Sequence, residues 1–266
     1  MQHLFEDWSN VANQLKSAEQ ILFMCDFDGT LTPIVDRPEM ADLNQEVRKL
    51  LSKLSRCRRI TVAVISGRSL NDLRTRIAIP SLIYAGNHGL EIVGPHYSYM
   101  HPVTNEIKKV LNIIHGVLLS SLGKIKGVIV EDKNLTLSVH YRLVDEDDVS
   151  QVASIFKNTL AGAENLGKIK TTEGKKVYEV RPAVSWHKGK AVKLIMKNLG
   201  KGGWYSGTLP VYLGDDLTDE DAFKVVENYG GIAVYVGQPM PESAASYFLK
   251  DTYEVENLLR SVLAIC

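Results

Sequence analysis

The sequence predicts an α/β protein: a doubly wound parallel sheet with a smaller α/β domain inserted into it. Apolar runs that do not alternate, such as residues 21–25 and 60–65, are typical of parallel strands covered on both faces. Amphipathic helical patterns lie between these runs, as expected for strands joined by right-handed crossovers. Between residues 104 and 182 the order of elements changes and an alternating strand pattern occurs. This stretch predicts the inserted domain.

Two separate blocks of the chain are expected to form the core. In the first block, helices at residues 43–54 and 70–77 separate strands at residues 21–25, 60–65 and 82–85. In the second block, helices at residues 191–199 and 220–227 alternate with strands at residues 210–213 and 232–236. Because both blocks repeat strand and helix in turn, we expect them to share one sheet. The predicted core therefore comprises residues 1–103 and 183–266.

Residues 104–182 predict a separate domain of two helices and four strands, in the order helix, two strands, helix, two strands. Within it, residues 135–140 alternate between apolar and polar side chains, which is typical of an antiparallel strand with one exposed face. Glu173 and Gly174 are expected to form the turn between the last two strands. A stretch of this length can form a small domain of its own.

The composition limits which partners are expected. The 266 residues carry 31 Lys and Arg against 31 Asp and Glu, so the net charge gives no reason to expect nucleic acid or an anionic membrane as a partner. The lysines between Lys188 and Lys201 fall on one face of an amphipathic helix, which predicts a solvated face. No apolar stretch approaches the roughly 20 residues that a membrane helix requires. We expect a cytoplasmic protein that is a monomer or a weak dimer.

The three cysteines are expected to be reduced thiols of an intracellular protein. Cys25, Cys57 and Cys266 are odd in number and have no metal-site spacing. Cys25 lies in an apolar run, where it is expected to act as a small buried apolar residue.

Four polar clusters directly follow four of the predicted strands. They are Asp26 with Asp28, Ser66-Gly67-Arg68, Gly86-Asn87-His88-Gly89, and Asp215 with Asp216 and Asp219. Any one of them alone is ordinary turn chemistry. Because the carboxyl ends of parallel strands meet at one edge of a sheet, the four are expected to form one ligand crevice. Three or more carboxylates there make an oxygen-rich site suited to Mg²⁺.

The motifs carry a resemblance to a known family. Asp26-Phe27-Asp28-Gly29-Thr30-Leu31-Thr32 resembles the first motif of the haloacid dehalogenase superfamily of aspartyl phosphatases, and Ser66, Lys188 and residues 214–221 match its later motifs in order. Residues 65–68, 85–91, 139–142, 179–182 and 186–191 are similar to trehalose-6-phosphate phosphatases of bacteria and plants. The resemblance runs from about residue 23 to residue 223. It implies a core of the haloacid dehalogenase type with an inserted cap domain, and Mg²⁺-dependent hydrolysis of trehalose 6-phosphate to trehalose and phosphate.

The resemblance assigns roles in an aspartyl-phosphate mechanism. Asp26 would attack the phosphoryl group, and Asp28 would protonate the leaving oxygen and then deprotonate the attacking water. Paired carboxylates with such different roles need environments that push their pKa values apart. Ser66 and Lys188 would bind the transferring phosphoryl oxygens. Asp26, the backbone carbonyl of Asp28, and Asp215 would hold Mg²⁺.

Recognition of the sugar phosphate is expected to involve further residues. Gly67 and Arg68 are expected to bind the substrate together with Ser66. By the resemblance, three cap residues match positions at which the family binds the sugar hydroxyls: Glu131, Lys133 and Glu179. Carboxylates suit this because they accept hydrogen bonds from hydroxyl pairs.

Several motif residues keep two interpretations. Asp216 and Asp219 are either N-cap and first-turn acids of a helix, or support for a metal-bound water and Lys188. The roles of three further residues stay open: His88, His140 and Arg142. In the cap, His140 and Arg142 could equally be structural.

Three other functions are compatible with the core motifs. The first is a phosphatase for another disaccharide or glycosyl phosphate, because substrate choice depends on the cap. The second is a phosphomutase, which would return the phosphoryl group to the sugar. The third is a non-catalytic regulatory domain, which the complete set of motif residues argues against.

Overall fold

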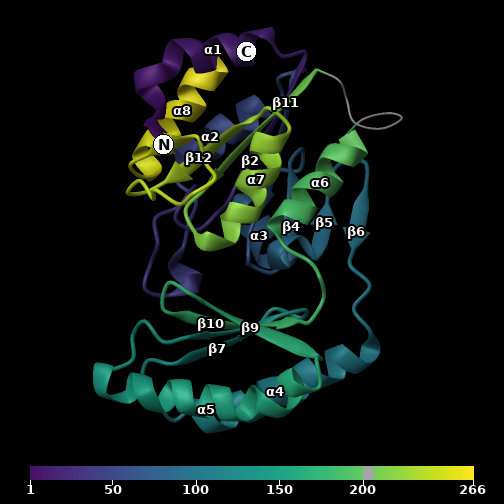
Figure 1. The fold of residues 1–266 in the computed structure, drawn as a ribbon, viewed down its shortest axis with the longest axis vertical. Helices are drawn as coiled ribbons and strands as arrows, with labels where there is room; N and C mark the ends of the chain where they lie inside the picture. The colour runs from purple at the N-terminus through teal and green to yellow at the C-terminus, as the bar shows by residue number, and fades with distance from the viewer. Residues whose placement is uncertain (200–206) are drawn as a thin grey trace. The chain divides into compact units, whose positions relative to one another are not determined.

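The structure is a computed structural model that describes residues 1–199 and 207–266. The chain forms two compact units, residues 1–100 with 186–266 and residues 101–185, and the predicted insert lies within the second (Figure 1). Lys201, the last lysine of the predicted solvated run, lies outside the described residues. Among the helices of the described residues, none is long and apolar enough to cross a membrane.

A nine-stranded sheet forms the centre of the first unit. Its strands, in order across the sheet, are β1 (Gln2–His3), β13 (Tyr247–Leu249), β12 (Ile232–Val236), β11 (Thr208–Gly214), β2 (Gln20–Cys25), β3 (Ile60–Ile65), β4 (Ile83–Gly86), β5 (Glu91–Val93) and β6 (Ser98–Met100). The pairs from β1 to β4 are parallel, and β5 and β6 add antiparallel pairs at one edge. In the centre, Phe23 lies opposite Val62 on one side and Val211 on the other.

Helices cover both faces of this sheet, which confirms the doubly wound core (Figure 1). One apolar cluster involves α1 (Trp8–Ser17), α2 (Gln45–Leu54), α3 (Leu70–Ile77) and α8 (Thr252–Ala264), and the other involves α6 (Lys188–Leu199) and α7 (Glu220–Asn228). Successive residues of β2 point to opposite faces, so Phe23 and Cys25 join the first cluster while Leu22 and Met24 join the second. Among its described residues, the unit also has four short 3-10 helices: η1 (Leu4–Asp7), η2 (Pro38–Met40), η3 (Asn87–Gly89) and η4 (Leu217–Asp219).

The second unit has the predicted order of helix, two strands, helix, two strands. Its antiparallel sheet runs β7 (Ile129–Asp132), β8 (Leu137–His140), β10 (Val177–Pro182), β9 (Ile169–Gly174), and its helices are α4 (Asn105–Leu122) and α5 (Glu146–Asn165). Leu118 of α4, Phe156 of α5 and Val139 of β8 share one apolar cluster. The predicted turn at Glu173 and Gly174 is wrong, because both residues belong to β9 and pair with β10. The turn lies at residues 175–176.

The cysteines require a correction. Cys57 follows α2 and Cys266 follows α8, and these two helices pack against each other. The structure joins Cys57 and Cys266 in a disulfide, so the prediction of three reduced thiols is wrong for this pair. The two residues are 209 positions apart, so their spacing gave no sign of it. Cys25 is a free, buried thiol. Its pKa is raised mainly by burial and to a smaller extent by the charge of Asp26.

Candidate active site

Backbone hydrogen bonds hold two of the turns at the carboxyl edge of the sheet against neighbouring parallel strands. The N–H of Asp26, after β2, donates to the carbonyl of Leu213 in β11 at 2.8 Å. The N–H of Ser66, after β3, donates to the carbonyl of Ala85 in β4 at 2.9 Å. These bonds hold the start of the turn after β2 against β11, and the start of the turn after β3 against β4.

Gly29 shapes the turn that carries the first acid pair. The turn is closed by hydrogen bonds from the N–H groups of Leu31 and Thr32 to the carbonyl of Phe27, at 2.9 and 3.0 Å. Gly29 has a φ of +84°, a conformation that side chains disfavour. A Cβ there would lie 2.1 Å from Oδ2 of Asp215. The glycine therefore allows this backbone to approach the Asp215 carboxylate closely.

Three buried carboxylates meet at the edge of the sheet. Asp26, Asp215 and Asp219 each present an oxygen within 4.8 Å of the others. Two of the three, Asp26 and Asp215, belong to the predicted metal set, and Asp219 was predicted as supporting it. A set of carboxylate oxygens with no nitrogen or sulfur suits a hard cation such as Mg²⁺ better than a softer metal. The donor set at this place therefore fits the predicted ion.

Lys188 supplies the buried positive charge of the cluster. It begins α6, and its side chain is 2% exposed. Its Nζ lies 2.7 Å from Oδ1 of Asp219 and 3.1 Å from Oδ1 of Asp26. Burial lowers the pKa of Lys188, but the charges of Asp219 and Asp26 outweigh burial and hold the pKa above its usual range. The lysine therefore stays charged although its side chain is buried.

The surroundings of Asp26 disfavour its charged form, in contrast to those of Lys188. Burial raises its pKa well above the ordinary value, and Asp219, Asp215 and Asp28 raise it further, while Lys188 lowers it. A cation bound among these carboxylates would oppose the same effects, since it favours the ionised form. The site thus holds more negative charge than Lys188 alone offsets.

Asp219 anchors the fourth cluster and is fully buried. Its Oδ1 accepts hydrogen bonds from Nζ of Lys188 and from the hydroxyl of Tyr212, the latter at 2.6 Å. Its Oδ2 accepts from the N–H groups of Asp215 and Asp216 at 3.2 and 3.1 Å. Asp216 in turn accepts from the N–H of Leu217, as the N-cap of η4. The two interpretations of Asp219 therefore coexist, because it closes a capping box and contacts Lys188.

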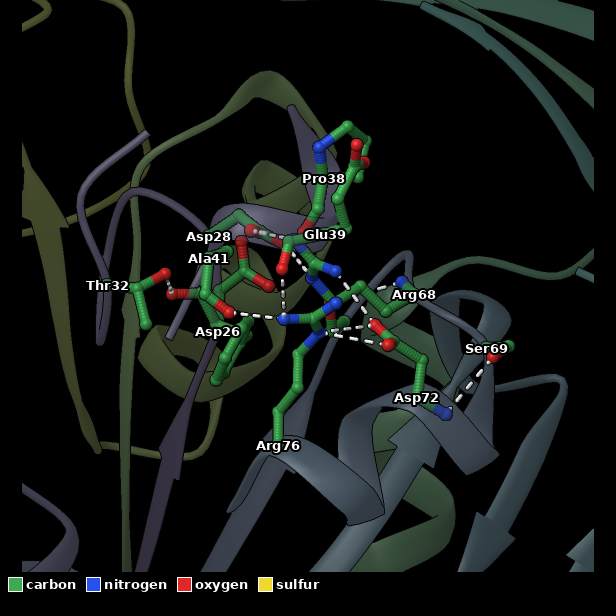
Figure 2. Close-up of polar contacts among 12 residues, drawn as sticks. Asp26, Asp28, Thr32, Pro38, Glu39, Ala41, Arg68, Ser69, Asp72 and Arg76 are labelled. Carbon is green, nitrogen blue, oxygen red and sulfur yellow. Dashed lines mark hydrogen bonds and ion pairs between the residues drawn. The ribbon is translucent and has the colours of Figure 1, made fainter. Parts of the chain in front are cut away.

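Arg68 fixes the second acid of the pair (Figure 2). Its Nε and Nη2 donate to the two carboxylate oxygens of Asp28, each at 2.7 Å. On its other edge, Nη1 donates to Oδ2 of Asp72 at 2.7 Å. The predicted substrate-binding residue thus has its guanidinium between two carboxylates.

The loop after β4 is held against the loop after β3. The N–H groups of Asn87 and His88 donate to the carbonyls of Arg68 and Ser66, at 2.7 and 2.8 Å. Asn87 and His88 both have positive φ values, 50° and 57°. The Asn87 amide also donates to Glu91 at 2.8 Å. Asn87 and His88 therefore brace the Ser66 turn through their backbone.

In the second unit, the predicted sugar-binding acids lie on one face of the sheet. Ser138 of β8 lies opposite Glu131 of β7 on one side and Glu179 of β10 on the other. Residues at paired positions point to the same face, so both carboxylates project from it. His140 lies two residues along β8, and its Nε2 is 2.9 Å from Oε2 of Glu131.

Glu179 is held by two cations of its own unit. Nζ of Lys133 donates to Oε1 at 3.0 Å, and the guanidinium of Arg181 contacts Oε2. Lys133 and Glu179 were both predicted as ligands of a sugar, and the structure brings them together. Arg142 has a different environment, since it donates to the carbonyl of Lys175 in the hairpin turn between β9 and β10.

Some residues of the site were not predicted. Tyr212 looked like an ordinary apolar strand residue, and nothing in its spacing marked its contact with Asp219. Asp72 and Arg76 were visible in principle, because they lie four and eight residues after Arg68, as neighbours on one helical face do.

Comparison with known structures identifies the fold. The chain shares its fold with a haloacid dehalogenase-like hydrolase from Bacteroides thetaiotaomicron, with a TM-score of 0.63, 15% identity, and coverage of 93% of this chain and 100% of that chain.

The particular family follows from the sequence. Residues 24–253 match the trehalose-phosphatase family, and the chain belongs to it. It is 36% identical over 262 residues to the trehalose 6-phosphate phosphatase RA3 of Zea mays, covering 92% of this chain and 70% of that protein. The C-terminal domain of the C. albicans trehalose-6-phosphate phosphatase has the same fold, with a TM-score of 0.83, 24% identity and 97% coverage of both chains.

Proposed function

We propose that this protein hydrolyses trehalose 6-phosphate to trehalose and phosphate, with Asp26 as the nucleophile. One observation carries the residue assignment: the Asp26 carboxylate lies 3.1 Å from the buried ammonium of Lys188, within a cluster of oxygen ligands. A nucleophile next to a fixed cation and a cation site is what attack on a phosphate dianion requires. The substrate is supported by membership of the trehalose-phosphatase family and by the activity named for the maize relative.

The reaction would proceed in two displacements. In the first, an oxygen of Asp26 forms a bond to phosphorus as the bond to the sugar oxygen breaks, and Asp28 gives that oxygen a proton. In the second, water attacks phosphorus as the bond to Asp26 breaks, and Asp28 takes the proton of the water. Phosphate leaves, and both aspartates return to their starting states.

Fixed charges would support both displacements. Lys188 and Ser66 are proposed to bind the phosphoryl oxygens, because developing charge is stabilised best by groups that do not need to reorganise. Asp26, Asp215 and the backbone carbonyl of Asp28 are proposed to hold Mg²⁺, which would neutralise phosphate charge when bound. Asp219 is proposed to keep Lys188 in place.

The second unit is proposed to recognise the sugar. Glu131 and Glu179 project from one sheet face, and Lys133 contacts Glu179, so this face offers hydrogen-bond acceptors and a cation for hydroxyl groups. His140 would orient Glu131. A Glu131→Gln variant should therefore lower kcat/KM on the order of 10-fold through KM, with the Mg²⁺ requirement unchanged. The matched control is Glu146→Gln on α5, an exposed glutamate, which should change neither value.

Released phosphate from the wild-type protein and from Asp26→Asn tests the proposal. The wild type should release phosphate from trehalose 6-phosphate with Mg²⁺ and not with a chelator, while Asp26→Asn should be folded and inactive. Near-normal, Mg²⁺-dependent turnover by Asp26→Asn would show that another group is the nucleophile. Isomerised sugar phosphate in place of free phosphate would indicate a phosphomutase. Faster release from another glycosyl phosphate would move the substrate assignment.

A further inference from the structure

Asp28 belongs to a chain of alternating charges that extends away from the proposed reaction centre. Asp28, Arg68, Asp72 and Arg76 are joined in this order by ion pairs of 2.7, 2.7 and 2.8 Å (Figure 2). We infer that Asp72 and Arg76 are positioning residues that act through Arg68 to orient the carboxylate of Asp28 for proton transfer. The inference rests on the proposed acid and base role of Asp28.

Arg68 has the geometry of a clamp. Its Nε and Nη2 form a two-pronged contact with both oxygens of Asp28, which fixes the plane of the carboxylate as well as its position. The same Nη2 donates to the carbonyl of Pro38 at 3.0 Å, and the guanidinium lies 5.3 Å from the ring centre of Phe27. The side chain of Asp28 is 37% exposed while that of Arg68 is 9% exposed, so the arginine is the fixed partner of the pair.

Asp72 holds the opposite edge of the guanidinium. It accepts from Nη1 of Arg68 and lies in the first turn of α3, where a carboxylate also interacts favourably with the helix dipole. Its backbone N–H is bound by the N-cap Ser69 at 3.2 Å. Burial raises the pKa of Asp72, but hydrogen bonds from Arg76 and Arg68 outweigh burial and leave the pKa below its usual value. Asp72 is therefore ionised at neutral pH.

Arg76 completes the support. Its Nε donates to both oxygens of Asp72 at 2.9 and 2.8 Å, and its Nη1 donates to the carbonyls of Glu39 and Ala41. The two outer ends of the support are thus a helix and the backbone of the 38–41 segment, which also contacts Arg68. Arg68 could not tilt toward solvent without breaking contacts to both.

A positioning role has a specific kinetic consequence. The sugar oxygen is a poor leaving group, so its departure depends on the proton that Asp28 supplies. Nitrophenolate is a good leaving group and departs from p-nitrophenyl phosphate without that proton. Disorder at Asp28 should therefore slow the first displacement with the sugar phosphate and spare the first displacement with the aryl phosphate. General damage to the fold would slow both.

The test compares Asp72→Asn and Arg76→Gln with a matched control on another helix. Glu256→Gln on α8 removes an ion pair of the same spacing, since Arg260 contacts Glu256 at 2.6 Å. We expect Asp72→Asn to lower kcat on trehalose 6-phosphate about 10- to 100-fold, as loss of an orienting partner does at metal ligands. KM and the Mg²⁺ requirement should be unchanged. The burst of nitrophenolate released in the first turnover, which reports the first displacement with p-nitrophenyl phosphate, should also be unchanged. Arg76→Gln should have a smaller effect of the same kind, which Arg76→Lys should partly reverse.

Each outcome decides the inference. Equal losses in the first displacement on the two substrates, or a loss carried by KM, would make Asp72 merely structural, and an unchanged kcat on trehalose 6-phosphate would remove it from the mechanism. Because Arg76→Gln leaves the Arg68–Asp72 pair in place, it decides the question if Asp72→Asn does not fold. Asp28→Asn, measured alongside, distinguishes a failure of the proposed acid role of Asp28 from a failure of the positioning role of Asp72 and Arg76. If the loss in Asp28→Asn does not depend on the leaving group, the proposed acid role of Asp28 itself fails. If the loss depends on the leaving group in Asp28→Asn but not in Asp72→Asn, only the inference about Asp72 fails.

Discussion

Lys188 carries the most direct test of the buried charge cluster. Its ammonium lies between the carboxylates of Asp219 and Asp26, at 2.7 and 3.1 Å, and is almost completely buried. A Lys188→Met variant keeps much of the volume but leaves both anions without their cation. Removal of one partner from a buried ion pair costs about 3–5 kcal/mol. Asp219 keeps its hydrogen bonds from Tyr212 and from the loop backbone, so we expect a loss near the lower limit.

The expected loss can be measured as a melting temperature. At about 2–4 °C per kcal/mol for a protein of this size, a loss of about 3 kcal/mol lowers Tm by about 6–12 °C. Bound Mg²⁺ would replace part of the missing positive charge. Ligand at 100 times its Kd adds about 2.7 kcal/mol of stability, so Mg²⁺ should recover much of the loss if the variant still binds it.

The pH dependence of the loss has a definite sign. The pKa of Asp26 is raised by burial above the ordinary value of 3.8, and Lys188 is the group that opposes this rise. For a group with a raised folded-state pKa, protonation favours the fold, and this stability is lost as pH rises through the folded pKa. Without Lys188 that pKa rises further. The deficit of Lys188→Met should therefore be small near pH 3.8 and should grow toward neutral pH.

Thermal unfolding with a chelator and with Mg²⁺, across this pH range, measures all three effects. Lys193→Met is the matched control, because Lys193 is exposed on the same helix. Equal melting temperatures for the two variants at neutral pH would refute the claim that Lys188 neutralises the cluster. A deficit that shrinks as pH rises would refute the assignment of the raised pKa to Asp26.

Two further predictions concern the metal site. Mg²⁺ should raise the Tm of the wild type more in mildly alkaline than in mildly acidic buffer. In acidic buffer the ion competes with a proton for Asp26, because the pKa of Asp26 is raised. Equal shifts of Tm in the two buffers would contradict this. Gly29→Ala should cost about 1–3 kcal/mol from the positive φ and should also weaken Mg²⁺ activation, since its Cβ would lie 2.1 Å from Asp215. Gly230→Ala, with a φ of +66° and no atom within 4 Å of the new Cβ, should show the strain alone; equal Mg²⁺ activation in the two variants would contradict the contact.

The core was predictable where one signal dominated. Residues 21–25 and 60–65 are largely apolar without alternation, and each run is followed by a turn that contains glycine. This combination is typical of strands buried on both faces, and β2 and β3 lie at these positions. The short strands β1, β5, β6 and β13 were not predicted. Each has two or three residues, too few for any periodicity to be detected.

The contacts of the site depended on chain topology and could not be read from local spacing. Arg68 and Asp28 are 40 residues apart, and they meet because β2 and β3 pair in parallel. Residues i and i+2 of a strand project to the same side. This rule does not place Asp28 beside Asp26, because β2 ends at Cys25 and a tight turn follows.

This early end of the strand has a chemical consequence for the acid pair. Asp26 faces Lys188 and Asp219 in the buried cluster, whereas Asp28 faces Arg68 at the edge of the solvent. The side chains are 8% and 37% exposed, so two carboxylates that are two residues apart lie in different dielectric surroundings and contact different cations. Burial raises the pKa of Asp26 well above its ordinary value, and Lys188 opposes that rise. The proposed mechanism needs Asp26 to attack as an anion, so it requires the positive charge of Lys188 and of a bound cation to keep this buried carboxylate ionised.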